Sequence, residues 1–130
     1  MSPIQTSYIM SKHAVLSFSE CLHLEMAMKS SAVQVSAVLP GPVKTKIFSS
    51  IEQHEDPDVA EHHKLMIEML EANGMAPQEA AKTIFEQLAC GKFWVSTHPE
   101  MMAMMAKQRA AHLSSLATPS LDTDSAFSIE

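Results

Sequence analysis

The sequence predicts an α/β fold with about two parallel strands and four or five helices. Residues 33–39 and 92–97 are short apolar runs with the β-branched or aromatic content of buried strands. Helical patterns lie before the first run and between the two runs. Parallel strands that are joined through helices form a right-handed crossover. We therefore expect two neighbouring strands covered by helices.

The first helix is expected from near Ser7 to about Lys29, because its apolar side chains recur at three-to-four spacing. We expect the buried stripe of this helix at Ala14, Phe18, Cys21, Leu22, Glu25 and Met26. After the first strand, Pro40 and Pro42 exclude a helix, and Gly41 permits a tight turn between them.

Helix boundaries are well marked in the second half of the chain. Asp56 and Pro57 predict a helix start, with an acidic N-cap and proline at the first helical position. This helix is expected to end at Gly74 in the left-handed conformation. The next helix is expected from Pro77 to just before Gly91.

A last helix is expected from Pro99, fading by Thr118. We expect residues 1–118 to form one structural portion, without an internal linker or repeat. Residues 119–130 are rich in Ser, Asp and Thr, have little apolar surface to bury, and are expected to form a mobile tail.

Tyr8 and Lys12 form the most informative pair of side chains. On a helix, residues four apart share a face, so the phenol and the ammonium can act on the same small volume. Free tyrosine has a pKa of about 10 and is a poor proton donor or acceptor at neutral pH. A neighbouring ammonium favours a phenolate, which makes such a pair a candidate general acid/base. The spacing alone is weak, because many helices contain it by chance.

The motifs that follow Tyr8 and Lys12 along the chain make this pair more informative than its spacing alone. The sequence runs from a Tyr-x-x-Ser-Lys helix through a strand into Pro-Gly-Pro-Val-Lys-Thr at residues 40–45. Residues 76–81 then open a helix, and residues 91–99 contain a last strand. This order resembles the C-terminal half of the short-chain dehydrogenase/reductase (SDR) family over roughly residues 3–100. The resemblance implies the C-terminal part of a Rossmann-like, doubly wound parallel sheet.

The resemblance also implies roles for particular residues. Tyr8 would be the catalytic acid/base, and Lys12 would activate it and contact the nicotinamide ribose. The loop after the first strand would contact NAD or NADP, as expected for ligands at the carboxyl ends of parallel strands. The cofactor-binding positions implied in this way are Lys12, Pro40, Gly41, Val43 and Thr45. A plain strand-ending turn is the alternative interpretation of this loop.

Two family features have no counterpart in this sequence. Gly41, Gly74 and Gly91 are the only glycines, and they lie too far apart for the glycine-rich turn that holds the cofactor pyrophosphate. Ser2 and Ser7 lie too close to Tyr8 to match the family's catalytic serine. We therefore expect a fragment or truncated form of an NAD(P)-dependent oxidoreductase that is inactive alone. The alternative is a non-catalytic chain that pairs with a full-length relative.

The charge and cysteine content of the chain bear on its binding partners and its location. Nine basic and fifteen acidic residues give a net charge of −6, which argues against nucleic acid and anionic membranes. The family resemblance implies a small alcohol or carbonyl substrate, and a homo-oligomer or pairing with a longer relative. Cys21 and Cys90 are expected as buried free thiols, with a disulfide as the open alternative, and this favours the cytoplasm. The neighbours His62 and His63 lack metal-ligand spacing, so no metal is expected.

Overall fold

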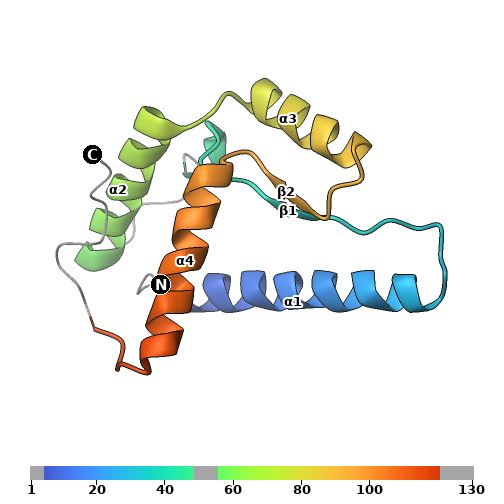
Figure 1. The fold of residues 1–130 in the computed structure, drawn as a ribbon. Helices are drawn as coiled ribbons and strands as arrows, with labels where there is room; N and C mark the ends of the chain where they lie inside the picture. Colours follow the sequence, from blue (N-terminus) through green and yellow to red (C-terminus); the bar gives the residue numbers. More distant parts are fainter. Residues whose placement is uncertain (1–4, 49–55, 121–130) are drawn as a thin grey trace. The chain divides into compact units, whose positions relative to one another are not determined.

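The structure of the chain is a computed structural model that describes residues 5–48 and 56–120. Two short parallel strands and four α-helices confirm the expected α/β class (Figure 1). In chain order the elements are α1 (Thr6–Met28), β1 (Ala37–Leu39), the 3-10 helix η1 (Lys46–Phe48), α2 (Pro57–Asn73), α3 (Pro77–Ala89), β2 (Trp94–Ser96) and α4 (Pro99–Ser115).

The chain divides into two compact units, one ending at Pro99 and the other beginning at Glu100. The second unit contains nearly all of α4, a helix without a buried side chain. Most of the expected tail, residues 121–130, lies outside the described residues. Among the described residues, no helix combines the length and apolar character that a bilayer crossing needs.

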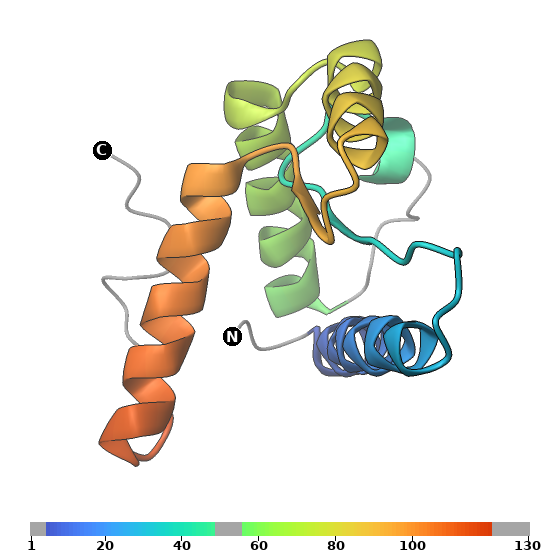
Figure 2. The same ribbon diagram turned by 45° about the vertical axis from the view of Figure 1, so that its right-hand side comes forward.

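The two strands pair in parallel, with Val38 opposite Val95, and lie side by side in both views (Figures 1 and 2). They are shorter than the expected runs 33–39 and 92–97, because pairing starts only where the Ala37 N–H donates to the Phe93 carbonyl at 2.7 Å. Before Phe93 the chain is still leaving the turn after α3. There the Ser36 hydroxyl donates to the Lys92 carbonyl at 2.8 Å in place of a ladder bond.

The core of the first unit lies where β1, β2 and α3 meet. Among the described residues, the buried apolar side chains are those of Ala37, Ala80 and Val95, and Val95 is fully covered. Contacts between α3 and β2 and between α1 and β1 place a helix against each strand. Such a small core fixes the strand register, and with it the positions of the residues that follow each strand.

The helix α1 matches its expected bounds, but only Leu22 and Met26 of its expected buried stripe are half-buried. Phe18 is 64% exposed, and Ala14 and Cys21 are exposed as well. The side that meets the rest of the unit runs through the half-buried Ile9 and Leu16, and on to His23, whose ring centroid lies 4.7 Å from that of Phe93. Residues seven apart lie almost on one line along a helix, and this line is opposite Phe18. The sequence pattern was a poor guide because apolar and polar side chains are spread around α1, so that no side of the helix is clearly the apolar one.

The two glycine caps differ from the expectation. Gly74 follows α2 in extended conformation, with φ −72° and ψ 130°, so the expected left-handed cap is wrong there. The left-handed glycine is Gly91, with φ +69°, after α3. There the Gly91 N–H donates to Leu88 and the Lys92 N–H to Gln87, the two bonds of a Schellman motif. Cys21 and Cys90 are free, as expected, but both are exposed rather than buried.

The N-cap of α2 is confirmed and gives a direct prediction. The Asp56 carboxylate accepts hydrogen bonds from the N–H groups of Asp58 at 3.0 Å and Val59 at 3.5 Å. In Asp56→Ala these N–H groups lose their side-chain acceptor, and we expect α2 to be destabilised by about 1 kcal/mol. Amide hydrogen exchange at Asp58 and Val59 should accelerate, whereas exchange in α3 should not change. Equal acceleration in both helices would contradict the local role of this cap.

Candidate functional site

The first part of the candidate site is the Tyr8–Lys12 pair on α1. The Lys12 ammonium lies 5.4 Å from the centroid of the Tyr8 ring, within the range of a cation–π contact. Both side chains are exposed, Tyr8 by 56%, so a ligand can reach them. Between them, Ser11 donates its hydroxyl hydrogen to the Tyr8 carbonyl at 2.7 Å and takes no part in the pair. The helix thus presents a phenol and an ammonium to the same volume.

The second part is the loop that follows β1, which is held by the residue after β2. The Gly41 N–H donates to Thr97 Oγ1 at 2.8 Å, and Thr97 is only 5% exposed. The same hydroxyl lies 2.8 Å from His98 Nδ1. A hydroxyl accepts from Gly41 and still has a hydrogen to donate to Nδ1, or a second lone pair to accept from Nδ1–H. Either histidine tautomer therefore preserves the Gly41 contact.

Gly41 is required at this point because the backbone passes against the His98 ring. A Cβ built on Gly41 would meet Nδ1, Cγ and Cβ of His98, all at or inside the limit for real Cβ contacts. The strand register brings these residues together, since Gly41 and Thr97 each follow the carboxyl end of a paired strand. The loop turn is therefore built against the end of β2.

A second anchor holds the same loop from the side of α2. Val43 and Met75 form an isolated parallel bridge. The Met75 N–H donates to the Pro42 carbonyl at 3.0 Å, and the Lys44 N–H donates to the Met75 carbonyl at 2.9 Å. Gly74 makes this approach possible, because a Cβ there would meet the Leu70 carbonyl and the Lys44 side chain. The residue that follows α2 thus fixes the middle of the loop.

This bridge determines which way the Val43 backbone faces. In an extended chain the N–H and C=O of alternate residues point to opposite sides. Since Pro42 and Lys44 use the groups that face Met75, the N–H and C=O of Val43 face away from it. Neither group has a hydrogen-bond partner among the described residues. The loop therefore offers one donor and one acceptor, side by side.

The remaining residues of the expected site are exposed. Pro40 lies at the end of β1, and Thr45 accepts a hydrogen bond from the Ile47 N–H at 3.4 Å at the start of η1. In the part of the chain that the structure describes, no hydrogen bond or ion pair joins Tyr8 or Lys12 to the loop. The structure thus brings the expected residues together as two groups, one on α1 and one after β1.

Sequence reasoning missed Thr97, His98 and Met75. Thr97 and His98 directly follow the second expected strand, so parallel pairing already places them beside the loop after the first strand. That signal was available from the sequence. Met75 gave no such signal, because it reaches the loop only through the extended conformation of Gly74.

Thr97→Val tests the first anchor. Valine keeps the shape of threonine but leaves the partly buried Gly41 N–H without its acceptor, which costs about 1–3 kcal/mol. We expect faster amide exchange at Gly41 and a lower urea midpoint, whereas Thr97→Ser, which keeps the hydroxyl, should retain most of the protection. Unchanged exchange at Gly41 in Thr97→Val would show that another group holds this loop.

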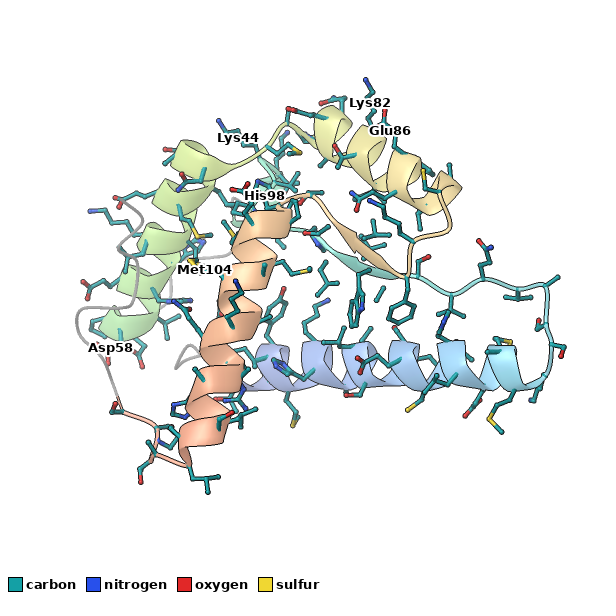
Figure 3. The ribbon with its side chains drawn as sticks, viewed as in Figure 1. Lys44, Asp58, Lys82, Glu86, His98 and Met104 are labelled. Atoms are coloured by element: carbon teal, nitrogen blue, oxygen red, sulfur yellow. The ribbon has the colours of Figure 1, made fainter. Side chains whose placement is uncertain are left out.

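The described residues contain no group of three or more His, Cys, Asp or Glu side chains that could hold a metal ion. His62 Nε2 is covered and has no hydrogen-bond partner among them. Two exposed ion pairs lie within single helices, Lys64–Glu68 at 3.8 Å on α2 and Lys82–Glu86 at 3.9 Å on α3, and Figure 3 labels the second pair. Such exposed pairs contribute little to stability.

Both groups of residues, the Tyr8–Lys12 pair and the loop after β1, lie in a segment that matches the model of a known family. Residues 1–56 match the family model for short chain dehydrogenases. The matched segment contains Tyr8 and Lys12 as well as the whole of the loop at residues 40–45. It ends before α3 and β2, so the wider resemblance to residue 100 rests on the sequence motifs alone. Searches of curated proteins and of solved structures gave no match.

Proposed function

We propose that the chain is the catalytic-tyrosine part of an NAD(P)-dependent short-chain oxidoreductase, in fragment or truncated form. Its reaction is oxidation of an alcohol or reduction of a carbonyl group on a small molecule. One observation carries this function: the matched residues 1–56 contain both the adjacent Tyr8 and Lys12 side chains and the loop after β1. The cytoplasm is its proposed location.

The loop fits one end of a nicotinamide dinucleotide. A carboxamide has one acceptor oxygen and one donor NH₂ group, which complement the N–H and C=O of Val43. The Thr45 hydroxyl and the Lys12 ammonium supply further polar contacts from exposed positions. The three glycines do not form a turn for the pyrophosphate. This chain therefore supplies contacts for the nicotinamide end, and a glycine-rich turn elsewhere must hold the phosphates.

When bound, the cofactor supplies or takes up the hydride. In the direction of alcohol oxidation, the Tyr8 phenolate accepts the hydroxyl proton while the hydride leaves the carbon. In the reverse direction, the Tyr8 phenol donates its proton to the carbonyl oxygen as the carbon receives the hydride. The Lys12 ammonium lies 5.4 Å from the centroid of the Tyr8 ring and places a positive charge on the same face of α1. Proton and hydride thus move to or from the same substrate carbon–oxygen bond.

We expect the 130-residue chain alone to bind neither NADH nor NADPH usefully. The measurement is the fluorescence of each dinucleotide when purified chain is added to high concentration. An enhanced or shifted emission would show that the described loop and α1 form a sufficient pocket. That result would contradict the proposed need for a phosphate-binding turn outside this chain.

The mass of the native protein tests whether such a turn accompanies the chain. An antibody against residues 122–130 would recover the native protein for intact mass measurement. A mass near twice 14.3 kDa, together with dinucleotide-dependent alcohol or carbonyl turnover, is the expected result. A native mass of 14.3 kDa without dinucleotide binding would contradict the oxidoreductase proposal.

A further inference from the structure

The side-chain amide of Gln87, on α3, binds both backbone groups of Ser96, the last residue of β2. Its Oε1 accepts from the Ser96 N–H at 3.2 Å, and its Nε2 donates to the Ser96 carbonyl at 2.8 Å. Nε2 also donates to the Thr83 carbonyl of α3 at 3.1 Å, so both of its hydrogens are used. Ser96 is only 4% exposed, so water has little access to replace these bonds. The amide therefore ties the end of β2 to α3.

Gln87 reaches β2 from the side opposite β1. The Ala37 N–H donates to the Phe93 carbonyl, and backbone groups of alternate residues in a strand point to opposite sides, so those of Ser96 point away from β1. The peptide that joins Ser96 to Thr97 is trans, so its C=O points to Gln87 while its N–H points to β1. Gln87 thus holds the peptide from which the Thr97 side chain extends.

Ser96 and Thr97 hold both of the groups that contact Gly41. Thr97 Oγ1 accepts from the Gly41 N–H at 2.8 Å. Ser96 Oγ accepts from the His98 N–H at 3.2 Å, and the His98 ring lies against the Gly41 backbone. A shift of Ser96 would therefore move the hydroxyl and the ring together, and with them the start of the loop after β1.

We propose that Gln87 is a positioning residue for the loop after β1, and that its effect reaches Gly41 through the end of β2. The hydrogen bonds of its side chain go to Thr83 and Ser96 and, among the described residues, to no residue of the loop. The effect of Gln87 on the position of Gly41 needs no cofactor, whereas an effect on dinucleotide binding rests on the function proposed above.

The first test is amide hydrogen exchange in the purified chain that carries Gln87→Met, which keeps an unbranched side chain of similar length and removes its donors and its acceptor. Exchange at Gly41 and Ser96 should become about tenfold faster, as expected when buried groups lose a hydrogen-bond partner. Exchange at Ala80, a buried residue of α3, should not change. The matched control is Gln78→Met on the same helix, where Gln78 is exposed, and it should leave Gly41 unchanged.

A Thr97→Val background separates an effect through the end of β2 from a general loss of stability. If Gln87 acts through Thr97, Gln87→Met should add little to the exchange rate at Gly41 once the hydroxyl is gone. The same acceleration at Gly41 in both backgrounds would overturn the proposal, and so would an unchanged rate in Gln87→Met. Should Gln87→Met fail to fold, Gln87→Glu keeps the acceptor for the Ser96 N–H but cannot donate to the carbonyls, and a wild-type rate at Gly41 in that variant would equally overturn it.

The second test measures the dissociation constants for NADH and NADPH in the full-length protein. Gln87→Met should raise them about as much as Thr97→Val does, and Gln78→Met should leave them unchanged. Unchanged constants in Gln87→Met, together with faster exchange at Gly41, would overturn the link from Gln87 to the cofactor. A full-length wild type that binds neither dinucleotide would contradict the proposed function instead, because exchange at Gly41 still decides whether Gln87 positions the loop.

Discussion

Tyr8→Phe should lower kcat of the proposed oxidoreductase by about 10²–10⁴-fold, the usual contribution of a general acid/base. The substitution removes only the phenolic oxygen, and Tyr8 is 56% exposed on a helix without buried residues. The fold should therefore be unchanged. Steady-state kinetics of the full-length protein, with the dissociation constant for NADH or NADPH measured in parallel, would separate lost chemistry from lost binding.

Ser11→Ala is the matched control for this prediction. Ser11 lies between Tyr8 and Lys12, and its hydroxyl bonds only the Tyr8 carbonyl of the same helix. The variant should keep wild-type turnover. Lys12→Met should lower both kcat and dinucleotide affinity, because the ammonium is proposed to serve the phenolate and the ribose. Turnover within threefold of wild type in Tyr8→Phe would remove Tyr8 from the proposed chemistry.

Gly41→Ala should be the most damaging substitution in the loop after β1. The added methyl group would run into the His98 ring, which is itself held by Thr97, so backbone or ring must move. Overpacking of this kind costs about 1–3 kcal/mol. We expect a lower urea midpoint and faster amide exchange at Gly41 and at Lys44, whose N–H donates to the second anchor.

A double-mutant cycle tests whether the His98 ring causes the expected loss of stability in Gly41→Ala. In a His98→Ala background two of the three clashing atoms, Nδ1 and Cγ, are gone, so Gly41→Ala should cost less there than in wild type. Gly91→Ala provides the matched control: its strain comes from φ +69° and its nearest neighbour is Gln34 at 3.6 Å. Its cost should be the same in both backgrounds. Additive effects of Gly41→Ala and His98→Ala would show that the ring does not set the position of the loop.

Local sequence signals predicted the elements that local interactions stabilise. Asp56 caps α2 with its own carboxylate, and Pro57 begins the helix, both within one turn of sequence. The Tyr8–Lys12 proximity likewise needs only the geometry of a single helix. The order of helices and strands and the parallel pairing followed from the same kind of signal. These features depend on interactions between residues a few positions apart.

Tertiary contacts determine the packed side of α1, the conformation of Gly74 and the hydrogen bonds that hold the loop after β1. The side of α1 that faces the sheet could not be derived from the sequence, because apolar and polar side chains are spread around the helix and no side is clearly the apolar one. Gly74 looked like a left-handed cap, yet it is extended because Met75 pairs with Val43 more than thirty positions away in the sequence. The contacts of Thr97 with Gly41 and of Gln87 with Ser96 arise only after the strands and α3 have packed. The sequence by itself determined the elements and the proximity of Tyr8 to Lys12, and packing determined the geometry of the loop after β1.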